Sequence, residues 1–492
     1  MSQARRRSLC LVSLLVLASL HGLMQARLRP LYQVSDEVQY VFAAQARAIA
    51  TVSSDAARCV SPDDGTLLPL LPGGGKPGFQ QVTAWLLGSL CESRQTFPLL
   101  ALRAATVLSL PVLVWCAWAL GRLLFPERVE VAALAGLFIA THPVIVKYGS
   151  GVTPDGWANA LAGLAFVAGA RILMRQASWM ELLLLPMATA AALAWKETST
   201  FLVLHLAIVC AVAVWRVWVY GTVRTRWAAA TVVVTAATAL AVVTARFGTL
   251  LGTTYALGPG ATRALAAPGT FVMNLGLDIV AGGGALLATS WSSLGNFGGT
   301  PLEPPAVTAV LVAVTALLAL AGVLLLSVHP RPDMPWPSAV VTAAWAVAIV
   351  GCLLQPSVRQ VLMASQDVHQ GRWLFPLAAP LACMAAAGLV RIAPRGRALP
   401  LLGVAALSAM WLTVLRIGEW YYATFPEVIR REHVFTRAIG GIEADDRRVW
   451  NLIQDASRVQ GSEGFWWLAA LLLICSAVVL VLLQPRALTT AP

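Results

Sequence analysis

Ser8-Leu-Cys-Leu-Val-Ser-Leu-Leu-Val-Leu-Ala-Ser-Leu-His-Gly-Leu-Met-Gln-Ala26 is the stretch that decides the fold. It is the first of many apolar runs along the chain. Many of these runs reach the roughly 20 residues that a helix needs to cross about 30 Å of hydrocarbon. The 492 residues are 58% hydrophobic and only 12% charged. In lipid, a helix satisfies all of its own backbone polar groups. The sequence therefore predicts an all-α polytopic membrane protein.

Apolar runs define twelve predicted membrane spans. They cover residues 8–26, 99–121, 131–147, 156–174, 179–195, 197–218, 227–246, 303–327, 337–355, 372–390, 398–415 and 465–484. The apolar stretch 270–290 is broken by Gly282-Gly-Gly284, so we expect it to be re-entrant or to lie on the membrane surface. The first span follows Arg5-Arg-Arg7 and is interpreted as an uncleaved anchor. The alternative is a cleaved signal peptide, although Met24-Gln25-Ala26 is a poor cleavage site.

Arginines are concentrated in the short loops on one predicted side of the membrane. These are Arg122, Arg128, Arg171, Arg175, Arg216, Arg224, Arg226, Arg331, Arg391, Arg395, Arg397 and Arg486. The positive-inside rule predicts that these short loops and both termini lie on the cytoplasmic side of the cell membrane. The long connections 27–98, 247–302 and 416–464 then lie outside, where a site is expected. We divide the chain into a transmembrane region, 1–415, the outer amphipathic segment 416–464, and a last helix with a cytoplasmic tail, 465–492.

The net charge of +12 indicates attraction to anionic membrane lipids rather than to nucleic acid, because no soluble basic module is present. Six of the eight cysteines fall in apolar runs and are expected to be small buried hydrophobes. They are Cys10, Cys116, Cys210, Cys352, Cys383 and Cys475. Cys59 and Cys91 lie in the first outer loop, where a disulfide is permitted. No cysteine or histidine spacing predicts a metal site.

Two acids, Asp36 and Glu37, follow the first span at the predicted outer mouth of the bundle. Ser35 could cap a helix running to about Ala50, with both acids in its favoured first turn, which is a purely structural explanation. Tyr40 falls one turn later on the same side. Acidic side chains at the end of an apolar bundle need an explanation. The alternative is that they take part in a reaction at the membrane surface.

Charged residues also mark two shorter outer turns. Asp155 lies between the third and fourth spans, near Lys147 and Tyr148, which could bind an anion. Its structural alternative is an acid in the first turn of the next helix. Lys196-Glu197 separates two apolar runs, and such charges are costly unless they are paired or face a cavity. The structural alternative is a solvated loop tip.

The segment Asp367-Val-His-Gln-Gly-Arg-Trp-Leu-Phe-Pro376 enters the tenth span from outside. Arg372 lies where a lipid phosphate would be, and a guanidinium donates to phosphate oxygens in a fork-shaped arrangement. The alternative is an interfacial anchor, with Trp373 in the aromatic belt. Ser290-Trp-Ser-Ser-Leu-Gly-Asn-Phe-Gly-Gly-Thr300 suits a tight interfacial loop.

Together these elements resemble the GT-C membrane glycosyltransferase superfamily, and are similar to a large bacterial family of predicted membrane proteins of unassigned function. The matching elements are Ser35-Asp-Glu-Val-Gln-Tyr40, Arg103, Thr153-Pro-Asp155, Lys196, Trp291-Ser-Ser-Leu-Gly-Asn-Phe-Gly298 and Gln370-Gly-Arg-Trp-Leu-Phe-Pro376. The chain departs from the family at Gly73-Gly-Gly-Lys-Pro-Gly-Phe79, where relatives tend to carry consecutive prolines and tyrosines. Trp373 replaces a more usual tyrosine.

The resemblance implies an inverting transfer of a sugar from a polyprenyl-phosphate donor to a glycan or lipid acceptor of the cell envelope. Asp36 would act as general base, and Glu37 or Asp155 would orient the acceptor or assist. The cations stabilising the departing phosphate would be Arg372, Lys196 and Lys147, with His369 beside them. Contacts to the acceptor or the loop would come from Tyr40, Lys76, Gln370 and Trp291. Two or three outer acids could hold a divalent cation loosely.

Two other classes of function fit the same layout. Twelve spans with both ends inside are also common in transporters and lipid flippases, but the spans hold almost no charge at mid-membrane, where transport sites lie. A non-catalytic membrane protein of envelope assembly would keep the fold without the activity.

Overall fold

A computed structural model describes residues 3–29, 77–92, 98–174, 179–220, 267–291, 335–363, 371–392, 398–419 and 464–484, with isolated residues in 40–44 and 227–241. Within these ranges every regular element is a helix and none is a strand. The predicted all-α class is confirmed.

Six helical stretches of the described chain are long and apolar enough to cross a membrane. They belong to α1 (Gln3–Leu28), α5 (Pro98–Val107) continued by α6 (Ser109–Leu124), α9 (Asp155–Leu173), α16 (Pro335–Met363), α17 (Ala378–Ile392) with its preceding 3-10 turn η3 (Gly371–Leu377), and α22 (Phe465–Leu482). The bent pair α7 (Val129–Thr141) and α8 (Pro143–Gly149) adds a seventh if counted as one span. Shorter apolar helices occur in α10 (Trp179–Trp195), α11 (Leu202–Tyr220) and α18 (Ala398–Glu419). The predicted span 303–327 lies outside the described residues, as does most of 227–246.

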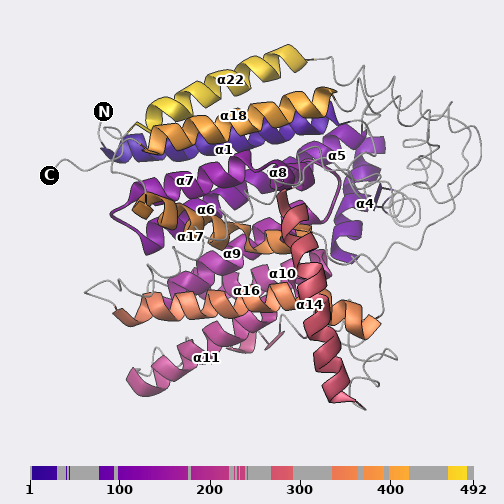
Figure 1. Ribbon diagram of the computed structural model, residues 1–492, viewed down its shortest axis with the longest axis vertical. Coiled ribbons are helices and arrows are strands. Elements are labelled where there is room, and N and C mark those ends of the chain that lie inside the picture. The colour runs from indigo at the N-terminus through magenta and orange to yellow at the C-terminus, as the bar shows by residue number, and fades with distance from the viewer. Residues whose placement is uncertain are drawn as a thin grey trace, which may run out of the picture.

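The first and last described helices, α1 and α22, run side by side in opposite directions (Figure 1). The Cys475 thiol lies 3.4 Å from the Ser13 carbonyl oxygen, and Gly464 lies beside the Arg27 guanidinium. The start of α1 and the end of α22 therefore share one end of the bundle. Arg122 and Arg216 also lie at this end, which we call the basic end. The opposite end, where α1 finishes, is the mouth end.

The predicted span 131–147 is not straight, because the chain bends by 62° between α7 and α8. Pro143 has no N–H and disfavours helical backbone in the residue before it. His142 is accordingly extended, with φ −66° and ψ 116°, and its ring accepts a hydrogen bond from the Ile145 N–H at 3.3 Å. Because of this bend, α8, which carries Lys147, runs in a different direction from α7.

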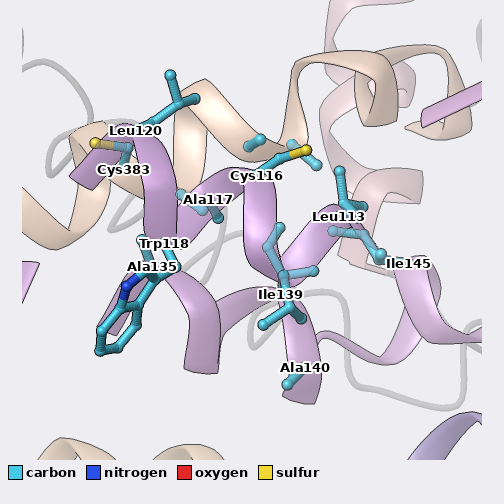
Figure 2. Close-up of a cluster of buried hydrophobic side chains, with 14 of the residues drawn as sticks. Leu113, Cys116, Ala117, Trp118, Leu120, Ala135, Ile139, Ala140, Ile145 and Cys383 are labelled. Atoms are coloured by element: carbon cyan, nitrogen blue, oxygen red, sulfur yellow. The ribbon is translucent and has the colours of Figure 1, made fainter. Parts of the chain in front are cut away.

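Small side chains allow the central helices to approach closely. Figure 2 shows Ala117, Ala135 and Ala140 among the larger Trp118 and Ile139 between α6 and α7. All six cysteines of the apolar runs are free thiols; five are buried, as predicted, whereas Cys210 is half-buried.

The helix α14 (Pro268–Trp291) continues through Gly282–Gly284, so the predicted break is wrong. Glycine in a helix interior costs only about 1 kcal/mol, and packing of α14 on η3 and α16 can offset that cost. In Figure 1 α14 runs steeply across the direction of α16 and α18. Its placement at the membrane surface stays a prediction.

Candidate functional site

Where α8 meets α9, the two helices are in backbone contact at the mouth end. A Cβ atom on Gly156 would lie 2.7 Å from the Ser109 hydroxyl oxygen and 3.2 Å from the Gly149 Cα, so a larger residue at position 156 would force its neighbours to shift. The connecting turn is buried, and the Thr153 hydroxyl donates to the Tyr148 carbonyl at 3.0 Å. Trp157 donates to the Ala105 carbonyl of α5 at 3.3 Å. These contacts fix the first residue of α9, Asp155, beside α8.

Asp155 and Lys196 form a fully buried ion pair. The Lys196 ammonium donates to the Asp155 carboxylate, although 41 residues separate them in the chain. Asp155 is 0% exposed and Lys196 is 4% exposed. Asp155 does lie in the first turn of a helix, where the dipole favours its charge, but it also binds a cation. The solvated loop tip considered for Lys196 is wrong.

A second buried cation, Lys147, lies on the neighbouring helix α8. It is 2% exposed, and its ammonium lies 5.4 Å from the centroid of the Tyr148 ring, a distance typical of a cation–π contact. The Tyr148 ring centroid is 6.0 Å from that of Phe375, which belongs to η3. Through this contact η3, whose second residue is Arg372, lies beside the helix that carries Lys147.

The segment 27–98, predicted to be the first outer loop, contacts the end of α10 through aromatic side chains. Tyr40 is 5% exposed, and its ring meets Phe79 edge-on at 5.4 Å between centroids. The Phe79 centroid is 6.1 Å from that of Trp195, the residue before Lys196. Here α4 (Pro77–Glu92) begins so close to α10 that a Cβ on Gly78 would lie 2.8 Å from the Ala194 carbonyl oxygen. Through Phe79, Tyr40 is linked to Trp195, the last residue of α10, which Lys196 follows.

Several predicted site residues lie outside the described part of the chain: Asp36, Glu37, Lys76, His369, Gln370 and Cys59. For Arg372, Trp291, Cys91 and Glu197 the structure describes the backbone alone. The roles predicted for these residues, including the disulfide, stay predictions.

One group of buried polar residues escaped sequence reasoning. His21 and Gln25 of α1 and Arg29, the residue after its end, recur every four residues, and all are at most 1% exposed. Arg103, singled out earlier only through the resemblance, is 1% exposed and contacts the end of the same helix. The four-residue spacing of polar side chains in an apolar span was the signal that could have identified them.

The arrangement suits the binding of an anionic group at the membrane surface. Two buried lysines, on α8 and after α10, lie at one end of the helical bundle, and Phe79 packs against Trp195, the residue before Lys196. Among the described residues no three His, Cys, Asp or Glu side chains come together as metal ligands.

No protein-family model and no curated protein matches the chain. Solved structures of an archaeal oligosaccharyltransferase, AglB from Archaeoglobus fulgidus, are similar to it. The complex with an inhibitory peptide and a dolichol-phosphate is 13% identical with a TM-score of 0.47, over 83% of this chain and 56% of that one. The apo form is 13% identical with a TM-score of 0.44, over 90% and 59%. A form tethered to an acceptor peptide is 12% identical with a TM-score of 0.43, over 83% and 55%.

The chain spans little more than half the length of these archaeal chains.

Proposed function

We propose that the chain is a membrane glycosyltransferase that moves a sugar from a polyprenyl-phosphate donor to an extracytoplasmic acceptor of the cell envelope. The observation that carries this proposal is the buried Asp155–Lys196 pair, with buried Lys147 on the adjoining helix. Lysine is almost never fully buried unless it is paired, and ionisable groups in membrane helices are by default candidates for function. Their place at helix ends, rather than at mid-span, favours surface chemistry over transport.

The two lysines suit the phosphate of the donor. An ammonium carries three N–H donors, so Lys196 can hold a carboxylate and a phosphate oxygen at the same time. In this proposal Asp155 fixes the Lys196 ammonium, and Arg372 and His369 approach the phosphate from η3 and the residues before it. The apolar polyprenyl tail lies along the spans.

The acceptor hydroxyl oxygen attacks the anomeric carbon while its proton passes to the Asp36 carboxylate. The bond from that carbon to the phosphate oxygen breaks, and its electron pair leaves with the phosphate. Attack from the opposite face inverts the configuration. Cations already in place stabilise the charge on the departing phosphate, a large contribution in such transfers. Glu37, Tyr40, Lys76, Gln370 and Trp291 orient the acceptor and the loop.

The arginines of the predicted short loops support one orientation of the bundle in the membrane. The basic end, which holds Arg122 and Arg216, faces the cytoplasm with both termini, and the mouth end faces outward. Asp36 and the buried lysines then lie on the same, extracytoplasmic side.

The test uses the full-length protein in proteoliposomes, a panel of labelled undecaprenyl-phosphate hexoses, and an envelope extract as acceptor. The wild type should transfer label, and Asp36→Asn should be slowed about 10²- to 10⁴-fold while still binding undecaprenyl phosphate. Lys196→Met should weaken that binding. The control is Glu127→Gln, at an exposed acid of the basic end, which should match the wild type.

Unchanged transfer by Asp36→Asn would contradict the role of that residue. If the wild type moves undecaprenyl phosphate across the bilayer without transferring label, and Asp36→Asn keeps this flux, the protein is a transporter. Absence of both activities, with envelope partners retained, would indicate a non-catalytic assembly protein.

A further inference from the structure

Polar atoms that make no hydrogen bond gather beside the buried ion pair. The Thr198 and Ser199 hydroxyls and the Trp195 indole N–H are buried and have no partner among the described residues. Thr198 is 3% exposed and Ser199 is 0% exposed. All three residues lie within three positions of Lys196, whose ammonium binds Asp155. The turn that carries this ammonium is therefore rich in hydrogen-bonding groups that the described part of the protein does not use.

A fourth atom of this kind lies on the carboxylate side of the pair. The Ser109 hydroxyl, at the first residue of α6, belongs to a residue that is 0% exposed, and it too has no partner in the described ranges. A Cβ atom on Gly156, the residue after Asp155, would lie 2.7 Å from the Ser109 hydroxyl oxygen. This hydroxyl is therefore beside the first turn of α9, where Asp155 lies.

These atoms call for a physical explanation. A buried hydroxyl or indole N–H without a partner destabilises the folded protein, and such groups are rare in native structures. Several of them around one ion pair indicate a polar ligand that supplies the missing partners.

The chemistry of the groups indicates which part of the donor they would bind. A phosphate only accepts hydrogen bonds, and cations such as Lys147 and Lys196 complement it. Serine and threonine hydroxyls are neutral and both donate and accept, as the hydroxyls of a sugar do. The Asp155 carboxylate also balances the charge of Lys196, so the surroundings of these hydroxyls suit a neutral ligand.

We propose that Thr198 and Ser199, together with Ser109 on the carboxylate side, form the subsite for the hydroxyl groups of the transferred hexose. This inference rests on the proposed function: the lysines bind the phosphate, and the neutral side chains bind the sugar. The subsite selects among hexoses, because a site built to hydrogen-bond a hydroxyl rejects a substrate in which that hydroxyl is missing or displaced.

The first test measures lipid binding to the full-length protein in nanodiscs. The ligands are undecaprenyl-phosphate glucose, galactose and mannose, and undecaprenyl phosphate alone. The wild type should bind at least one hexose lipid more tightly than undecaprenyl phosphate. Thr198→Val, Ser199→Ala and Ser109→Ala should each weaken binding of that hexose lipid about 3- to 10-fold, the contribution of one hydrogen bond, and leave binding of undecaprenyl phosphate unchanged.

Thr189→Val is the matched control. The Thr189 hydroxyl is also buried and unpartnered among the described residues, but it lies on α10 seven residues before Lys196, about 10 Å along the helix. This variant should bind every lipid as the wild type does.

Two results would overturn the sugar subsite and leave the proposed function intact. One is equal weakening of the hexose lipid and of undecaprenyl phosphate by the subsite variants. The other is an effect of the control as large as theirs. A wild type that binds none of the four lipids would overturn both proposals.

The second test is unfolding in mixed SDS micelles without donor lipid. Because neither hydroxyl has a partner among the described residues, Thr198→Val and Ser199→Ala should keep or raise the unfolding midpoint. Thr153→Val should lower it, since the Thr153 hydroxyl donates to the Tyr148 carbonyl at 3.0 Å. Losses in the subsite variants as large as that of Thr153→Val would show that their hydroxyls serve the fold, and would overturn the inference.

Discussion

The buried pair of Asp155 and Lys196 makes a quantitative prediction about stability. Asp155→Asn leaves a buried ammonium without its carboxylate, and Lys196→Met leaves a buried carboxylate without its ammonium. Because both side chains are at most 5% exposed, each single variant should lower the free energy of unfolding by about 3–5 kcal/mol. The double variant removes both charges and should lose much less than the sum of the two, since replacing a buried pair with uncharged groups is often close to neutral.

The assay is unfolding in mixed SDS micelles, followed by circular dichroism, for the wild type, both single variants and the double variant. Arg171 and Glu181 provide the control pair, because the Arg171 side chain is 42% exposed. Breaking that pair with Glu181→Gln should cost about 0–1 kcal/mol. Single variants of the buried pair that cost no more than this control, or costs that simply add in the double variant, would refute the reasoning.

Three further predictions follow from the packing and the topology. Gly156→Ala should destabilise the protein by about 1–3 kcal/mol, because its Cβ would lie 2.7 Å from the Ser109 hydroxyl oxygen. Gly276→Ala in α14, where nothing lies within 4 Å, should instead be neutral or stabilise by up to about 1 kcal/mol, and equal losses in SDS unfolding would contradict this contrast. Phe79→Ala should cost about 3–5 kcal/mol in the same assay, because Phe79 is 3% exposed and packs between two aromatic rings; a loss under about 1 kcal/mol would count against the aromatic layer. In a cysteine-free background, an impermeant maleimide on intact cells should label Trp466→Cys and leave Glu127→Cys unlabelled, and the reverse pattern would invert the proposed orientation.

Much of the fold could be predicted from hydrophobic length alone. A bilayer allows few backbone solutions, so an apolar run of sufficient length becomes a helix whatever its neighbours are. The bend at His142 was readable from Pro143 and was not predicted, because the run 131–147 is apolar on both sides of it. The reverse happened at Gly282–Gly284, where a local helix-breaking signal did not interrupt α14.

The site could be predicted only in part. Asp155, Lys147 and Lys196 were identified because charges beside apolar spans need an explanation. The contact between Asp155 and Lys196 could not be predicted from the sequence. The two residues are 41 positions apart, so helical or strand periodicity does not relate them. The contact of Arg103 with the end of α1 could not be predicted for the same reason. Arg103 and Ala26, whose carbonyl it contacts, are 77 positions apart in the sequence.

The position of a bound donor phosphate tests the central claim most directly. The measurement is a cryo-EM structure of the full-length protein in nanodiscs with undecaprenyl phosphate. The account predicts phosphate density at the mouth end, within hydrogen-bonding distance of the Lys196 or Lys147 ammonium. Phosphate density at the basic end, or a mouth end without density at saturating lipid, would contradict it.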